Sequence, residues 1–202
     1  MKKAIIFTWA LTALFLFSFK VSAQSIKGKL IGGINAGQVD GDDYAGFDKP
    51  GLILGAAAAF PLSEKIFLQP EVFYSQKGAK NSEKNPAYFR WRLNYIETPV
   101  VVHFRIVKRF GFDAGISPNF LLKSKVDLGT GYDDNTKDFD KVNLCLLGGL
   151  EFRIVRGLDL NLRYSRSVTP INSKESSSYG RKFYTSTLSL SLRITLNKVE
   201  ED

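Results

Sequence analysis

Paired carboxylates can act as general acid and general base, and Glu71 and Glu97 are the candidates for such a pair in this sequence of 202 residues. Both lie in segments where apolar and polar residues alternate, on the face that carries the charged side chains. The charged residues on that face that can pair with them are Asp113, Glu151, Arg105, Arg153, Arg163 and Arg193. Buried charges must be paired and hydrogen-bonded, so this set predicts an ion-pair network more strongly than a catalytic pair.

Nucleophilic and metal chemistry have few candidate residues. His103 is the only histidine, and Cys145 is the only cysteine. A hydrolase needs a base beside an exposed nucleophile, and no nucleophile motif accompanies His103. One histidine and one cysteine are too few for a zinc site, and Cys145 is interpreted as a small interior side chain. We therefore expect no catalytic residue, no cofactor and no metal.

Two acidic segments offer the oxygen ligands that calcium prefers. Residues 38–49 include Asp40, Asp42, Asp43 and Asp48, and residues 124–140 include Asp127, Asp133, Asp134, Asp138 and Asp140. Neither segment has the spacing of an EF-hand. Solvated acidic loops are the stronger interpretation.

Residues 1–23 have the composition of a cleaved signal peptide. Lys2 and Lys3 precede an apolar run over 4–19, and small residues lead to a predicted cleavage after Ala23. A retained anchor is the alternative, but the run is shorter than the ~20 residues of a spanning helix. Cleavage removes three lysines, and the net charge falls from +8 to +5. The remaining cations are spread along the chain, so no nucleic-acid partner is expected.

Alternation with period two predicts that the rest of the chain is built from β-strands. The predicted strands are 26–37, 50–62, 66–78, 89–107, 110–123, 141–155, 158–169 and 183–197. Tight turns at 63–65, 108–109 and 156–157 alternate with long polar loops at 38–49, 79–88, 124–140 and 170–182. This pattern predicts an all-β fold, an eight-stranded antiparallel up-and-down transmembrane β-barrel over 24–197, followed by a charged tail at 198–202.

The two faces of these strands predict which side meets lipid. One face is almost free of charge, with rows such as Leu52, Leu54, Ala56, Ala58 and Phe60. The opposite face collects Lys27, Lys29, Glu71, Lys77, Glu97, Arg105, Asp113, Lys123, Glu151, Arg153, Asp159, Arg163 and Arg193. A soluble lipocalin-like barrel would have the reverse arrangement. The mean hydropathy of −0.09 fits a membrane barrel because the two faces cancel.

The loop-side rim carries the remaining candidates for interaction. Arg166 is the one charge expected on the outward face, where it can reach lipopolysaccharide headgroups. Aromatic residues are expected to form a girdle at each membrane boundary. The loop-side girdle is predicted from Tyr74, Trp91, Tyr164 and Tyr184, and the turn-side girdle from Phe60, Phe104, Phe110 and Phe152.

Several segments resemble the PorT-like outer-membrane β-barrel family. The main ones are 68–78 (LQPEVFYSQKG) and 93–101 (LNYIETPVV), with shorter pieces at 32–35, 115–118 and 160–165. The resemblance implies an eight-stranded barrel in the bacterial outer membrane. The founding member of that family takes part in protein secretion. The last strand here departs from a common barrel ending, because no terminal aromatic residue closes it.

These patterns predict a non-enzymatic integral outer-membrane protein whose outer loops bind an envelope component. The expected partners are outer-membrane lipid and lipopolysaccharide, with envelope or secretion proteins as further candidates, and the barrel is expected to be monomeric. The alternative is an accessory component of a secretion or envelope-assembly system. A membrane lipid-modifying enzyme is the third hypothesis. It is disfavoured because the sequence has no loop-side Ser/His or Asp/His pair.

Overall fold

The computed structural model describes residues 26–40, 47, 49–80, 90–172 and 182–196. The predicted signal peptide (1–23) and charged tail (198–202) lie outside the described residues. Within those described ranges, no helix is both long enough and apolar enough to cross a membrane.

Nearly all of the described chain is β-strand, as predicted. The strands are β1 (Lys27–Asp40), β2 (Lys49–Pro61), β3 (Ile66–Lys77), β4 (Arg90–Glu97), β5 (Val100–Arg105), β6 (Phe110–Asp127), β7 (Tyr132–Asp134), β8 (Val142–Val155), β9 (Leu158–Ser167) and β10 (Tyr184–Thr195), with one 3-10 helix, η1 (Thr136–Asp138).

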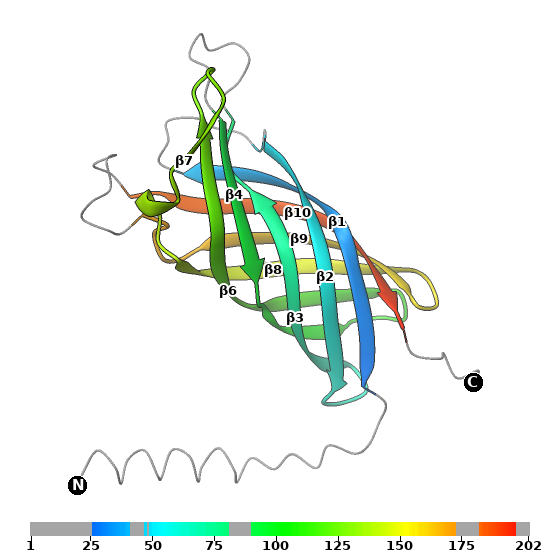
Figure 1. Ribbon diagram of the computed structural model, residues 1–202. Helices are drawn as coiled ribbons and strands as arrows, with labels where there is room; N and C mark the ends of the chain where they lie inside the picture. The colour runs from blue at the N-terminus through cyan, green and yellow to red at the C-terminus, as the bar shows by residue number, and fades with distance from the viewer. Residues whose placement is uncertain (1–25, 41–46, 48, 81–89, 173–181, 197–202) are drawn as a thin grey trace, which may run out of the picture.

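The strands close into a barrel. Each strand pairs antiparallel with its neighbours, and β1 pairs both β2 and β10, so the first and last wall strands meet (Figure 1). β4 and β5 both lie between β3 and β6 and act as two halves of one wall strand. With β7 outside the wall, the predicted eight-stranded barrel is confirmed.

The single strand predicted over 89–107 is interrupted at Thr98–Pro99. Proline has no N–H to donate, so it breaks a β-ladder. The wall stays continuous because the N–H of Thr98 donates to Pro118 and the carbonyl of Pro99 accepts from Glu71, at 2.9 and 2.8 Å.

The loop predicted over 124–140 begins later than expected. β6 continues to Asp127 and pairs with β7, so a hairpin stands above the rest of the wall (Figure 1). A β-bulge precedes it: Asn94 pairs with Lys123 but Tyr95 pairs with Leu121, which leaves Leu122 as an extra residue. An extra residue reverses the alternation, so the predicted inward position of Lys123 is wrong and its side chain is exposed.

The division between the two faces is otherwise as predicted. Exposed apolar residues cover the outside of the wall, and buried polar residues fill the inside. Lys27, at the turn-side end of β1, is exposed instead of interior. Arg105 and Arg153 are only partly buried near the same end. The tight turns also occur where they were predicted, and Gly157 adopts the positive φ (85°) that suits a two-residue hairpin turn.

Trp91 is not part of the outer aromatic girdle. Odd-numbered residues of β4 face inward, and the Trp91 side chain is 1% exposed. Tyr164 is exposed on the outer face, with Tyr74 and Tyr184 partly exposed. At the turn side, the rings of Phe110 and Phe152 are in contact, with centroids 4.9 Å apart.

Candidate functional site

The turn-side half of the barrel interior contains a network of ion pairs, here called the plug. Its carboxylates are Glu71, Asp113, Glu151 and Asp159, and its cations are Lys29, Arg153, Arg163 and Arg193. Inward-facing positions on β1, β3, β6, β8, β9 and β10 supply them, because every second residue of a wall strand points inside. The predicted interior ion-pair network is confirmed for Glu71, Asp113, Glu151, Arg153, Arg163 and Arg193. The other two predicted members lie outside the plug: Glu97 pairs with Lys77, and Arg105 stacks on the Phe67 ring.

Arg163 makes the tightest contacts of the plug. Its Nη1 and Nη2 donate to the two carboxylate oxygens of Glu71 at 2.7 and 3.0 Å, and Nη2 also donates to Asp113 at 3.0 Å. Gln69 donates to Glu71 from the same strand at 2.7 Å. A bidentate arginine–carboxylate pair fixes geometry as well as charge, so this pair orients the centre of the plug.

Arg193 contacts three of the four plug carboxylates. Its Nη1 lies 3.2 Å from Glu71, 3.4 Å from Glu151 and 3.6 Å from Asp113. Towards the turns, Lys29 lies 3.2 Å from Asp159 and 3.5 Å from Glu151. Four carboxylates thus face four cations, and the plug is neutral without any additional ion.

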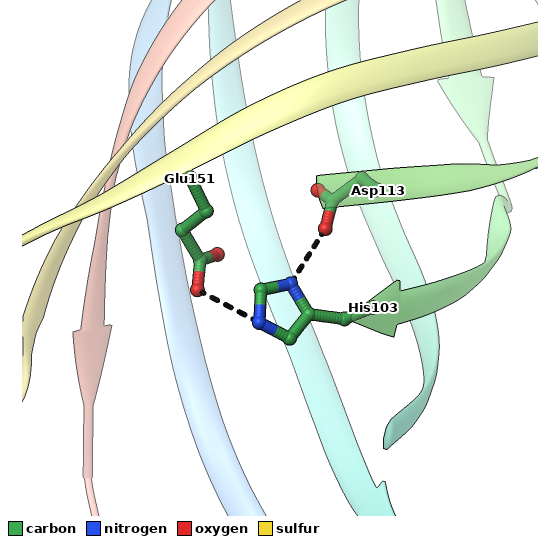
Figure 2. Close-up of side chains that lie close together, drawn as sticks. All are labelled: His103, Asp113 and Glu151. Atoms are coloured by element: carbon green, nitrogen blue, oxygen red, sulfur yellow. Dashed lines mark hydrogen bonds and ion pairs between the residues drawn. The ribbon is translucent and has the colours of Figure 1, made fainter. Parts of the chain in front are cut away.

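His103 borders the plug on its turn side (Figure 2). Its Nδ1 lies 2.8 Å from Asp113, and its Nε2 lies 3.8 Å from Glu151. The potential ligand atoms of these three residues lie within 4.8 Å of one another, as a metal site would require. However, Arg163, Arg193 and Lys29 already neutralise the two carboxylates, and a divalent cation would add two uncompensated charges. The arrangement fits a histidine held by the ion-pair network better than a metal centre.

A second buried pair lies further towards the loops. Lys77 Nζ is 2.8 Å from Glu97 Oε1, and both side chains are buried. They line a small internal cavity of about 10 Å³ together with Asn35, Ser75 and Thr187. A cavity of this size holds about one water molecule. Cys145 is buried nearby, as predicted, and its sulfur accepts from Asn119 at 3.0 Å.

An apolar cluster, here called the cap, closes the loop-side mouth. Its members are Val39, Ala79, Trp91, Leu93, Tyr95, Phe139, Ile171 and Phe183. The Trp91 ring packs edge-on against Phe139 and Phe183, with centroids 5.4 and 5.2 Å apart. Phe139 and Ile171 come from connecting segments that fold into the mouth.

The sequence did not predict the cap. Its signal was present but weak: Phe139 is a large apolar residue in the polar stretch 133–141, and Ile171 stands alone in 169–175. A solitary large apolar side chain in a polar loop is not decisive, because Phe139 is buried whereas Leu128 in the same segment is exposed.

Comparisons with known proteins agree with this architecture. Residues 22–173 match the family described as outer membrane protein beta-barrel domain. The chain belongs to this outer-membrane β-barrel family. No curated protein matches the sequence.

Two solved structures share the fold of this outer-membrane barrel. Neisserial surface protein A is 13% identical, with a TM-score of 0.52 over 85% of this chain and 97% of that one. Ail, the attachment invasion locus protein of Yersinia pestis, solved in complex with the heparin analogue sucrose octasulfate, is also 13% identical, with a TM-score of 0.55 over 86% and 100%. The barrel therefore resides in the bacterial outer membrane, as predicted, and its apolar outer face meets lipid.

Arg166, on the outward face of the outer-membrane barrel, forms an ion pair with a carboxylate of the same chain. Its Nη2 lies 3.3 Å from Asp40 Oδ2, and Ser186 donates to the same oxygen at 2.9 Å. The side chain remains exposed at the loop-side rim, as predicted. Because Asp40 already balances its charge, Arg166 is a weaker candidate for contact with lipid phosphate than the sequence indicated.

The acidic residues of the 124–140 segment shape its turns. Asp127 Oδ1 accepts from the N–H groups of Gly129 and Gly131, at 2.9 and 3.2 Å. Asp134 accepts from the hydroxyl and N–H of Thr136, which hold the pKa of Asp134 at about 2. The sequence interpretation is a solvated acidic loop, and these hydrogen bonds give Asp127 and Asp134 a structural role that weighs against calcium binding. Asp42, Asp43 and Asp48 lie outside the described residues.

Proposed function

We propose that this protein is a non-conducting, non-enzymatic, monomeric barrel whose loop-side end binds a component of the cell envelope. The observation that carries the proposal is the filled interior: the plug occupies the turn-side half, and the cap closes the loop-side mouth. An eight-stranded barrel has an interior just wide enough for its own side chains. The lipid-facing wall and the two ends of the barrel are then the surfaces left for interaction, and the loop-side end is the one that carries the long connections.

The positions of the titratable groups support a non-enzymatic role. His103 lies near the turn-side end of β5, between Asp113 and Glu151 (Figure 2). Glu71 is bound by two arginines, so it is held charged and occupied. General acid–base catalysis needs a group that is free to exchange a proton with a substrate.

Conductance in a planar lipid bilayer tests the filled interior. The purified protein is expected to produce no conductance steps at neutral pH, because ions would have to cross both the plug and the cap. The double variant Trp91→Ala and Phe139→Ala is also expected to stay closed, because the plug remains. A general-diffusion porin inserted in the same way is the positive control. Steady ion currents through the wild-type protein would refute the proposal.

The second candidate function is an accessory role in secretion or envelope assembly. It would follow from membership of the PorT-like family. Its support is the position of the two motif segments, which lie side by side: Phe73 pairs with Glu97, and Pro70 with Val100. A deletion strain with impaired export of proteins to the cell surface, restored by the wild-type gene, is the expected result for this role. Normal export in that strain would count against it.

A further inference from the structure

The hairpin above the wall carries cations on its outward face. Arg92 of β4 pairs in register with Lys125 of β6, and Asn94 pairs with Lys123. The bulge at Leu122 turns Lys123 and Lys125 outward, while Ser124 between them is buried. We call Arg92, Lys123 and Lys125 the basic stripe.

The carboxylates of this face do not neutralise the basic stripe. Asp134 lies 3.3 Å from Lys123 and also accepts two hydrogen bonds from Thr136. Arg92 stacks on the Tyr132 ring, 4.6 Å from its centroid, and Nη2 donates to the Tyr132 hydroxyl at 3.3 Å. Asp134 also lies opposite Lys125 in the β6–β7 pairing, but within the part of the chain that the structure describes no ion pair joins a carboxylate to Arg92 or Lys125. Two positive charges therefore remain available.

The apolar residues of β6 indicate where the basic stripe lies relative to the membrane. The outward row of β6 is apolar through Ile116, Phe120 and Leu122, all of them exposed. Lys123 follows directly, and at about 3.3 Å per residue Lys125 lies within roughly 10 Å of the last apolar side chain. Short turns of such barrels face the periplasm and long loops the exterior, so this level corresponds to the headgroups of the outer leaflet.

We propose that the basic stripe binds a phosphorylated glycolipid of the outer leaflet through its phosphate groups. This inference rests on the proposed function and names the partner of its loop-side surface. The guanidinium fork of Arg92 and the ammonium group of Lys125, which are not held in ion pairs among the described residues, match phosphate oxygens, and the Tyr132 ring holds the fork in place. A lipid phosphate is confined to the height of the stripe, which favours it over a soluble anion.

The test compares binding of bisphosphorylated lipid A to detergent-purified wild type and to the triple variant Arg92→Gln, Lys123→Gln and Lys125→Gln, by native mass spectrometry. Loss of three charges is expected to weaken binding roughly 10- to 100-fold. The matched control Lys65→Gln, Lys108→Gln and Arg109→Gln removes three exposed charges at the turn side and is expected to bind like wild type. Retention of the heat-dependent gel mobility verifies that both variants fold.

Two results would overturn the inference: equal affinity of wild type and stripe variant for lipid A, or equal affinity of wild type for fully dephosphorylated lipid A. Sucrose octasulfate is a soluble polyanion, so it tests whether the basic stripe prefers a lipid-borne anion to a soluble one. Weak competition with lipid A supports a membrane lipid as the ligand. Binding as tight as that of lipid A would show that the ligand need not be a lipid, and the inference would be wrong. The conductance experiment is independent, so failure of the basic stripe and failure of the proposed function can be told apart.

Discussion

Replacement of Arg163 with leucine is expected to lower the free energy of unfolding of the barrel by about 3–5 kcal/mol, because it leaves buried carboxylates without their partner. Glu71 would lose its bidentate contact and Asp113 one of its cations, and only Arg193 would remain close to both. Urea unfolding of the protein in lipid vesicles, followed by tryptophan fluorescence, measures the loss.

Arg153→Leu is the control for this prediction. Arg153 also pairs with a plug carboxylate, Asp159, at 3.0 Å, but its side chain is 38% exposed and Asp159 keeps Lys29. A loss of about 1 kcal/mol or less is expected. The double variant Glu71→Gln and Arg163→Met, which removes charge from both partners, is expected to be more stable than Arg163→Leu. Equal losses for Arg163→Leu and Arg153→Leu would show that burial of the plug does not determine its energetics.

The second large effect is expected on the outer face. Leu190 lies midway along the apolar row of β10, is 42% exposed and pairs with Leu162 and Ile34. Leu190→Arg places a charge near the middle of the bilayer, and it is expected to cost about 2–4 kcal/mol. The same unfolding measurement in vesicles reports it.

The control for this second prediction is the same substitution at a residue nearer the membrane boundary. Leu196, 60% exposed, lies at the turn-side end of the same row, where an arginine reaches the interface. Leu196→Arg is expected to cost about 0–1 kcal/mol. If both substitutions destabilise the protein equally, the assignment of this face to lipid is wrong.

The sequence predicted the wall and the plug because both depend on a local pattern. Alternation placed Glu71, Arg163 and Arg193 on one face, and closure of the sheet was enough to bring them together. Pro99 was visible as a residue without an N–H, so the interruption of its strand could have been inferred.

Other features depend on tertiary contacts that no short pattern encodes. The extra residue at Leu122 has no glycine or proline beside it, so the reversal that exposes Lys123 was missed. Phe139 and Ile171 enter the cap only because their loops fold over the mouth. The basic stripe was missed for the same reason as the bulge, since the outward position of both its lysines depends on that one residue.

The plug also determines when the barrel can finish folding. Arg163 and Glu71 are 92 residues apart in the chain, and Lys29 and Asp159 are 130 apart. Arg153 and Asp159 can pair within the β8–β9 hairpin, but these two pairs join strands far apart in the sequence, so no early hairpin can form them. Until the first and last strands meet, each buried cation must stay hydrated. Pairing of β1 with β10 and dehydration of the interior therefore occur together, as one late and cooperative step of assembly.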